Sequence, residues 1–581
     1  MIRLEEVRVR YPQATTTALT TPVVTIGEGE LVLVVGPTGS GKSTLLGTLN
    51  GLVPHFTGGT LSGRVVVDGR DTREYRPRDL ADVIGVVRQN PAASFVADTV
   101  EDEIAYGMET LGVRPNVMRR RVEETLDLLG LATERHRLLR ELSGGQQQRV
   151  AIAAVLAAGP HVLVLDEPTS ALDPVAAEEV LSALQRLVHD LSLTVVLAEH
   201  RLERVIHHAD RIILVHGGQA TVALEPAEAM ARSVVFPPVI ELGRMAGWDP
   251  LPLSVRDARR RAGPLRAELA PVLLDSERDA RARQHAAAGA GPMGGTGRWL
   301  RRLLGSQDPA GPGDAAPGPG GRPDQPAAQT TALTVQLGTC RALDGVDLAV
   351  QAGEVTAVMG RNGAGKSTLL WALVGQLRPA AGSVRIGAAD PAELAPTRRA
   401  GLVGMVPQDP SALLYAQTVA QECADADAEA DAPAGTAAGL LADLAGPLDP
   451  RRHPRDLSEG QRLALALAIV LSRRPQVVLL DEPTRGLDYA AKSRLVDALR
   501  SLTSGGHAVV MATHDVELAA EVADRVLLLA DGQLVADDPS PSVLADSTAY
   551  APQVARVLHP IPLLTVAAVR RSLEAVRDRS R

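Results

Sequence analysis

Hydrophobic residues along the chain fall into short apolar runs, each followed by an amphipathic stretch. The clearest runs are Leu-Val-Leu-Val-Val before Gly36 and Val-Thr-Ala-Val-Met before Gly360. Both are rich in β-branched residues and lead into a helix-like segment, which predicts a buried strand, a loop and a helix at each place. Residues 1–12 alternate apolar and polar positions and predict a half-buried strand.

The apolar runs are all too short to cross a membrane. The richest stretch, Leu463–Ser472, falls well below the roughly 20 residues of a spanning helix and predicts a buried helix instead. The strand-like opening of the chain is not the pattern of a signal peptide. If the protein acts at a membrane, we expect it to dock on a partner that spans the bilayer.

The loop after each of the two runs has the pattern of a phosphate-binding loop. In such a loop, backbone N–H groups surround the phosphates, a lysine reaches the β- and γ-phosphates, and a serine hydroxyl binds Mg²⁺. The chain has only three lysines, and two of them stand in these loops. The candidate phosphate-binding residues are Gly36, Gly39, Gly41, Lys42, Ser43 and Thr44 in the first loop, and Gly360, Gly363, Gly365, Lys366, Ser367 and Thr368 in the second.

Further motifs recur in the same order in both halves of the chain. Gln89 recurs as Gln408, LSGGQ from Leu142 as LSEGQ from Leu457, Asp166-Glu167 as Asp481-Glu482, and His200 as His514. Five motifs in register indicate a tandem duplication. The second copy is slightly shorter between its phosphate-binding loop and Asp481.

In each copy, a further apolar run, Val-Leu-Val-Leu before Asp166 and Val-Val-Leu-Leu before Asp481, is followed by two carboxylates. Asp166 and Asp481 end these runs, and an aspartate at the carboxyl end of a strand can orient Mg²⁺ and its waters. The next residue, Glu167 or Glu482, is placed to polarise an attacking water as a general base. Capping of a helix is the structural alternative for such a carboxylate.

LSGGQ between a phosphate-binding loop and an Asp-Glu strand end resembles the ATP-binding-cassette (ABC) ATPases. The resemblance covers about residues 1–235 and 330–545. It implies an α/β fold of two P-loop NTPase cassettes, each with a parallel-sheet core, an antiparallel β-subdomain and a helical subdomain. It also implies internal head-to-tail pairing, with ATP between one P-loop and the LSGGQ of the other cassette. Because LSGGQ opens a helix, its N-terminus can face a γ-phosphate that another element holds.

The resemblance assigns residues to two composite ATP sites. Glu167 and Glu482, His200 and His514, and Gln89 and Gln408 would be catalytic. Tyr11 would stack on adenine, and Asp173 and Asp488 would reach across the pair. Mg²⁺ would be bound by Ser43, Gln89 and Asp166 at site one and by Ser367, Gln408 and Asp481 at site two. Site one would take Ser458, Gly460 and Gln461 from the second cassette, and site two would take Ser143, Gly145 and Gln146 from the first.

The two copies differ near ATP. The second has no aromatic residue that matches Tyr11, so adenine would stack less well there. Glu459 replaces Gly144 in the second signature sequence, and a carboxylate near a phosphate costs energy unless it turns to solvent or to a cation. We therefore expect site one to be the weaker hydrolytic site. The alternative is that Glu459 points away and changes nothing.

Outside the two cassettes the composition changes. Residues 286–329 are dominated by Gly, Pro and Ala and predict a flexible linker. Residues 236–285 predict a helical extension of the first cassette, and 546–581 form a C-terminal extension. Trp299–Leu304 in the linker is either a solvated fragment or a turn at a membrane surface.

Several segments are similar to the ATPases of energy-coupling-factor (ECF) importers, namely 50–69, 89–113, 197–212 and the extension from Pro237. That resemblance implies uptake of a vitamin, a vitamin precursor or a cobalt or nickel ion. The partners would be integral membrane transport subunits gripped by the helical subdomains, and a separate substrate-binding membrane component. The protein would then lie at the cytoplasmic face of the cell membrane.

Two other classes compete with this interpretation. One is a fused sugar-type ABC importer ATPase, and the other is a soluble tandem-cassette factor that acts on ribosomes. The second class usually has a long, charged, helical linker, unlike residues 286–329. A net charge of −9 also argues against broad binding of nucleic acid. The two cysteines, Cys340 and Cys423, are too few for a disulfide framework and fit a reducing cytosol.

Overall fold

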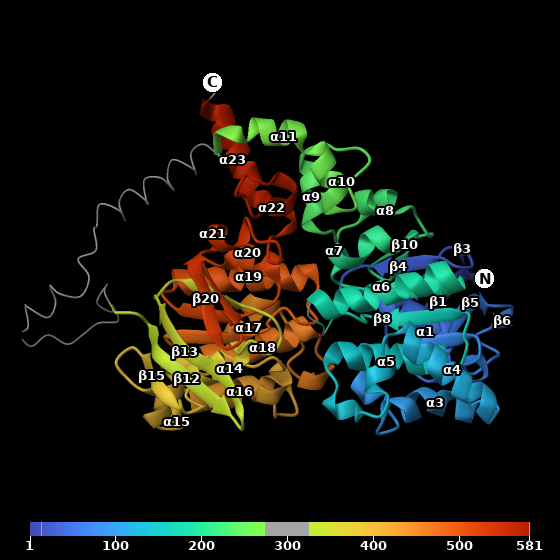
Figure 1. Cartoon of the computed structure of the whole chain (residues 1–581), viewed down its shortest axis with the longest axis horizontal. Coiled ribbons are helices and arrows are strands. Elements are labelled where there is room, and N and C mark those ends of the chain that lie inside the picture. Colours follow the sequence, from blue (N-terminus) through green and yellow to red (C-terminus); the bar gives the residue numbers. More distant parts are fainter. Residues whose placement is uncertain (13, 171, 173, 273–324, 580–581) are drawn as a thin grey trace, which may run out of the picture.

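The computed structural model describes residues 1–12, 14–170, 172, 174–272 and 325–579. It contains two α/β cassettes side by side, the first drawn in blue to green and the second in yellow to red (Figure 1). Trp299–Leu304, Asp173 and most of the predicted linker lie outside the described residues.

A five-stranded parallel sheet forms the centre of the first cassette. Its spatial order is β10-β4-β9-β8-β7, with bounds Arg211–His216, Leu31–Val35, Thr194–Ala198, Val162–Asp166 and Ile84–Val87. Every residue of β4 is buried, because Leu31, Leu33 and Val35 face one hydrophobic cluster and Val32 and Val34 face another. Burial on both faces is why a parallel strand has a continuous apolar run in the sequence.

Antiparallel strands extend this sheet. β1 (Ile2–Arg10) is the predicted opening strand, and it pairs with β5 (Thr60–Val67), β2 (Leu19–Thr20) and β3 (Val24–Ile26). β6 (Arg70–Asp71) pairs with β5, and β11 (Gln219–Ala220) joins β2 to β10. Together they form the β-subdomain in front of α1 (Lys42–Leu49).

The second cassette repeats the plan. Its main sheet has the order β16-β17-β18-β14-β19-β20, with bounds Val403–Val406, Val477–Asp481, Ala508–Ala512, Val355–Met359, Arg525–Ala530 and Gln533–Pro539. A separate antiparallel sheet contains β13 (Cys340–Val350), β12 (Ala328–Leu337) and β15 (Ala381–Ile386). Equivalent strands hold equivalent positions, so the predicted fold class is confirmed.

Helices flank both sheets. The helical subdomains consist of α3 (Val100–Thr110), α4 (Pro115–Leu128) and α5 (Gly144–Leu156) in the first cassette, and of α16 (Val419–Glu429), α17 (Thr436–Ala445) and α18 (Glu459–Leu471) in the second. The others nearest the site are α6 (Pro174–Leu191), α7 (Leu202–Val205), α14 (Lys366–Leu373), α19 (Tyr489–Ser504) and α20 (Val516–Val522). The predicted buried helix at Leu463–Ser472 is the body of α18, whose leucines are nearly fully buried.

The helical segments after the two cassettes pack against each other (Figure 1). One group is α9 (Pro238–Met245), α10 (Val255–Arg261) and α11 (Gly263–Glu268), and the other is α22 (Gln553–Leu558) and α23 (Val566–Arg579). Leu558 and Val569 are fully buried in the same hydrophobic cluster as Ile240. An ion pair of 2.9 Å joins Arg577 Nε to Glu268 Oε1. We call this contact between the two extensions the joint.

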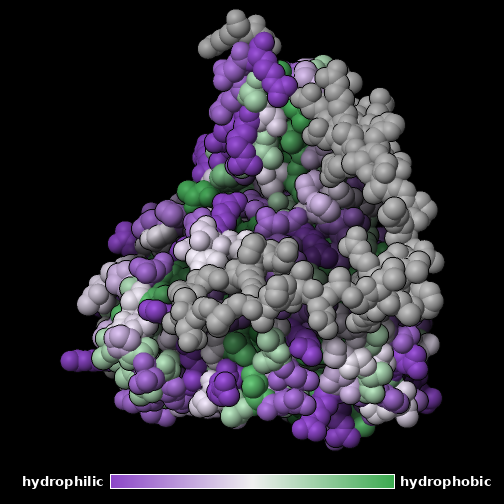
Figure 2. Space-filling view, turned by 90° about the vertical axis from the view of Figure 1, so that its left-hand side faces the viewer, coloured by the Kyte–Doolittle hydropathy of each residue, from purple (hydrophilic) through white to green (hydrophobic). Residues whose placement is uncertain are grey.

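The surface of the second-cassette side mixes hydrophobic and hydrophilic residues (Figure 2). Green and purple side chains lie interspersed over this face, which is typical of a surface that faces water. Within the part of the chain that the structure describes, none of the helices combines the length and the apolar character needed to span a bilayer.

Candidate functional site

The two phosphate-binding loops have the same geometry. Each follows a central strand and ends in a glycine with left-handed φ, +111° at Gly41 and +102° at Gly365. A Cβ at Gly41 would stand 2.8 Å from the carbonyl oxygen of Ala18, so only glycine fits there. Lys42 Nζ donates to the carbonyl oxygens of Gly36 (2.8 Å) and Pro37 (3.1 Å).

Lys366 repeats these contacts within the second loop, donating to the carbonyl oxygens of Gly360 (2.9 Å) and Arg361 (3.2 Å). Both lysines are buried. Burial lowers the pKa of Lys42, while the carboxylates of Glu167 and Asp166 act in the opposite direction. A buried ammonium beside backbone N–H groups is suited to an anionic phosphate.

The candidate Mg²⁺ ligands lie together at each site. The Ser43 hydroxyl is hydrogen-bonded to Asp166, and that of Ser367 to Asp481. Burial raises the pKa of both aspartates, and these hydrogen bonds partly offset the shift. Oδ1 of Asp481 is buried without a hydrogen-bond partner among the described residues. A hydroxyl and a carboxylate with a free oxygen fit the all-oxygen coordination of Mg²⁺.

The candidate general bases occupy a strained backbone conformation. Glu167 and Glu482 have φ of +52° and +49°, a conformation that costs a non-glycine residue on the order of 1–3 kcal/mol. Their N–H groups each donate to a strand carbonyl oxygen, of Ala198 and Ala512, at 2.9 Å. The backbone therefore turns sharply at the strand end, and each carboxylate is directed towards the histidine after the neighbouring strand.

Each glutamate is paired with its predicted histidine. His200 Nε2 lies 2.6 Å from Glu167 Oε1, and His514 Nδ1 lies 2.7 Å from Glu482 Oε2. Gln89 Nε2 donates to Glu167 Oε2 at 3.0 Å, whereas Gln408 is exposed after β16. At site one the structure thus brings Gln89, Glu167 and His200 together.

The signature sequences begin helices, as predicted. Ser143 caps α5 and Ser458 caps α18, each in a capping box with the glutamine three residues later, Gln146 or Gln461. A Cβ at Gly145 or Gly460 would come within 2.7 or 2.8 Å of an alanine Cβ on α6 or α19. Glycine therefore permits close packing of these helices.

Glu459 turns away from its own helix N-terminus towards a cation. Its Oε1 lies 2.5 Å from Nη2 of Arg462, one turn further along α18. This pairing favours the alternative in which Glu459 leaves site one unaffected. The reason for expecting a weaker site one is correspondingly reduced.

Tyr11 lies beside the first phosphate-binding loop. Its hydroxyl is hydrogen-bonded to Thr44 Oγ1 at 3.0 Å, so the ring lies against the first turn of α1. At the corresponding turn between β12 and β13, Cys340 is exposed.

A contact between the cassettes reaches the first phosphate-binding loop. Asp488 Oδ2 accepts a hydrogen bond of 2.6 Å from the N–H of Thr38 in the opposite phosphate-binding loop, while Oδ1 caps α19. Burial raises the pKa of Asp488, but hydrogen bonds from Ala491 and Thr38 outweigh it and hold the pKa below its ordinary value. Asp173, the predicted equivalent, lies outside the described residues.

Three residues next to these motifs were missed by the sequence reasoning. Arg201 Nη1 lies 2.9 Å from His514 Nε2 in the other cassette, and Tyr489 donates to Glu203 at 2.7 Å. Glu199 is buried and accepts from the N–H groups of Thr169 (2.9 Å) and His200 (3.0 Å), and burial raises its pKa. The sequence did contain a signal, because the two copies differ on both sides of the histidine: Glu199 and Arg201 in the first copy correspond to Thr513 and Asp515 in the second.

Known proteins resemble the chain over nearly its whole length. Residues 19–170 and 343–485 match a family model described as ABC transporter. A Streptomyces coelicolor protein named as an ABC transporter ATP-binding protein is 58% identical and covers 99% of this chain and 100% of its own. A Methanosarcina acetivorans protein with the same description is 33% identical, and the match covers 94% of this chain and 85% of that protein. A solved structure of an RNase-L Inhibitor shares the fold, with 20% identity and a TM-score of 0.55. The match covers 93% of this chain and 91% of that chain.

Proposed function

This chain is an ATPase of the ABC transporter family with two fused cassettes, and we propose that it energises a membrane importer from two ATP sites shared between the cassettes. Proteins of this family bind ATP, generally with Mg²⁺. We assign site one to Lys42, Ser43, Gln89, Asp166, Glu167 and His200 with the signature of α18, and site two to Lys366, Ser367, Gln408, Asp481, Glu482 and His514 with the signature of α5.

Each group has a distinct task in this proposal. Lys42 and the N–H groups of its loop bind the phosphates, and Ser43 and Asp166 would hold Mg²⁺, which neutralises charge on the transferred phosphoryl group. Glu167 accepts a proton from the attacking water, and His200 keeps the carboxylate and the γ-phosphate in line. The second site repeats these roles, with Glu482 as the base.

We further propose that the importer is of the ECF kind and takes up a vitamin, a vitamin precursor or a cobalt or nickel ion. The first-cassette segments similar to ECF ATPases support this, as does the extension that forms half of the joint. The protein would act at the cytoplasmic face of the membrane, on integral transport subunits and a separate substrate-binding component.

The observation that carries the proposal is a cleft that connects the surface with the three candidate Mg²⁺ ligands of the first cassette. It has a volume of about 470 Å³, and its lining includes Ser43, Gln89, Asp166 and Phe56. Phe56 is 78% exposed, and a large exposed aromatic side chain is typical of a site that a partner covers. In the second cassette Tyr415, shortly after Gln408, is 83% exposed. A helix of a membrane subunit seated at Phe56 would contact the same loop that holds Gln89.

The proposal can be tested by purifying the chain from its own cells in mild detergent. We expect a multi-span membrane protein to copurify, and Phe56→Asp to release it while ATP binding is retained. Val535→Asp, which adds the same charge at an exposed position of β20, is the matched control. Recovery with ribosomes and no membrane partner would overturn the import function. Uptake assays on membranes that contain the complex then separate an ECF substrate from a sugar.

A further inference from the structure

The two candidate catalytic histidines contact their glutamates through different ring nitrogens. At site one, Nε2 of His200 faces Glu167, whereas at site two it is Nδ1 of His514 that faces Glu482. Nε2 of His514 is taken by Arg201, which belongs to the first cassette and directly follows His200. The residue that follows His200 in the chain therefore contacts the histidine of the other site through its guanidinium.

The chemistry of this contact fixes the hydrogen-bond roles of His514. A guanidinium has donors and no acceptor, so Arg201 must donate and Nε2 must accept. A neutral ring that accepts at Nε2 carries its proton on Nδ1, where it is donated to Glu482. A phosphate oxygen also accepts hydrogen bonds only, so it cannot be bound by Nε2 in this tautomer. The contact with Arg201 and a contact with the γ-phosphate are mutually exclusive at that atom.

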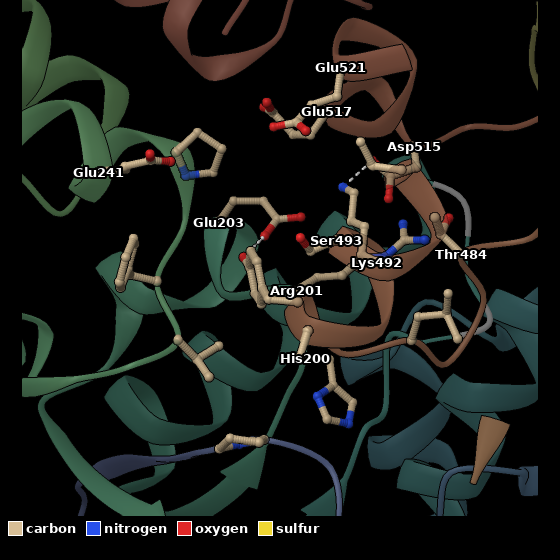
Figure 3. A pocket seen from close by; sticks show the side chains of 18 of the residues that line it. His200, Arg201, Glu203, Glu241, Thr484, Lys492, Ser493, Asp515, Glu517 and Glu521 are labelled. Atoms are coloured by element: carbon tan, nitrogen blue, oxygen red, sulfur yellow. Dashed lines mark hydrogen bonds and ion pairs between the residues drawn. The ribbon is translucent and has the colours of Figure 1, made fainter. Parts of the chain in front are cut away.

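The surroundings hold Arg201 in this position. The contact borders a cavity of about 560 Å³ between the cassettes, where Arg201 and Glu203 lie opposite Lys492 and Asp515 (Figure 3). Lys492 Nζ is 2.8 Å from Asp515 Oδ1. Burial raises the pKa of Asp515, but the charges of Lys492 and Arg201 outweigh it and hold the pKa below its ordinary value. The Nη2 nitrogen of Arg201 is buried without a hydrogen-bond partner among the residues described.

The contact has one direction only. Arg201 and Asp515 occupy equivalent positions after the two histidines, but Asp515 caps its own helix α20. Arg201 has no such capping role at α7, and its long side chain crosses to the other cassette instead. Arg201 adjoins His200 in the chain, so a movement of His200 towards a phosphate at site one would also shift the backbone that carries Arg201.

We propose that Arg201 is a positioning residue that holds His514 away from the γ-phosphate until site one closes, and so makes hydrolysis at site two depend on ATP at site one. This inference rests on the proposed role of His514. The third lysine of the chain, Lys492, supports the device by binding Asp515 beside Arg201.

The test measures site two alone, in a chain with Glu167→Gln at site one. Adding Arg201→Met should lower the ATP concentration for half-maximal turnover roughly three- to tenfold, because a charged hydrogen bond no longer competes with ATP. Arg201→Lys retains a donor and should restore part of the difference. Tyr489→Phe, which removes another hydrogen bond of the same interface, should leave half-saturation unchanged. A large loss of turnover in Arg201→Met would instead make Arg201 a phosphate ligand and overturn the proposal.

A second measurement does not depend on ATP turnover. The ¹⁵N shifts of the His514 ring, assigned with His514→Gln, should report a proton on Nδ1 in the chain without nucleotide and a change of tautomer when ATP is added. The Nε2–H tautomer without nucleotide would refute the contact. If this signature is found but His514→Ala keeps full turnover at site two, the proposed role of the histidine fails and the contact stands.

Discussion

The joint between the two extensions should hold the cassettes together without ATP, and Leu558→Ala tests this. Leu558 is fully buried among residues of both extensions, and replacing a buried leucine by alanine costs about 2–5 kcal/mol. Since each 1.4 kcal/mol is a factor of about ten, the dissociation constant of the two halves should increase by a factor of between about thirty and a few thousand.

The assay separates the halves covalently and asks whether they stay together. A protease site placed within residues 286–329 allows cleavage between the cassettes, and size-exclusion chromatography without nucleotide follows. We expect cleaved wild-type halves to coelute and the Leu558→Ala halves to separate. Leu527→Ala, a change of the same kind in the core of the second cassette alone, should lower the melting temperature but leave the halves together. Coelution of the Leu558→Ala halves would refute the reasoning.

Three further predictions concern individual side chains. Burial raises the pKa of Glu517 to about 7 from 4.5, so the stability that the protonated side chain provides is present below pH 4.5 and is lost as the pH rises through 7. Glu517→Gln should therefore raise the melting temperature, measured by calorimetry, more at pH 8 than at pH 5. An equal effect at both pH values would contradict the raised pKa. Gly460→Ala places a Cβ 2.8 Å from Ala491 Cβ and should lower the free energy of unfolding, measured with denaturant, by about 1–3 kcal/mol. It should also slow ATP turnover at site one in a chain that carries Glu482→Gln. An unchanged stability and turnover would show that α18 can accommodate the extra methyl group. Glu459→Gly should change site-one turnover by less than about twofold, because the carboxylate is already paired with Arg462; a tenfold rise would restore the expectation of an impaired site one.

Much of the fold could be predicted because the central strands are buried on both faces. The residues of β4 are all apolar, and those of β14 are apolar except for the buried Thr356. Such runs indicate parallel strands, whose carboxyl ends meet at one edge of the sheet. That rule places Asp166 and Asp481 near the phosphate-binding loops. The pairing of Glu459 with Arg462 was also within reach, since residues three apart on a helix are neighbours.

The contacts between the cassettes could not be predicted in the same way. An amphipathic helix shows that one face is buried, but its pattern does not identify the partner, so the packing of α22 on α9 was not expected. The contact of Arg201 with His514 depends on how two pseudo-equivalent loops meet across the interface. It is visible in the sequence only as a difference, arginine in one copy and aspartate in the other.

The central claim is that one chain contains two complete ATP sites, each shared between its cassettes. Native mass spectrometry of the Glu167→Gln/Glu482→Gln chain with Mg²⁺ and ATP tests it most directly, because both bases are removed and bound ATP is retained. The account predicts a single chain with two ATP molecules, and loss of one when Lys42→Ala is added. A species with nucleotide only in pairs of chains, or a single ATP per chain, would contradict it.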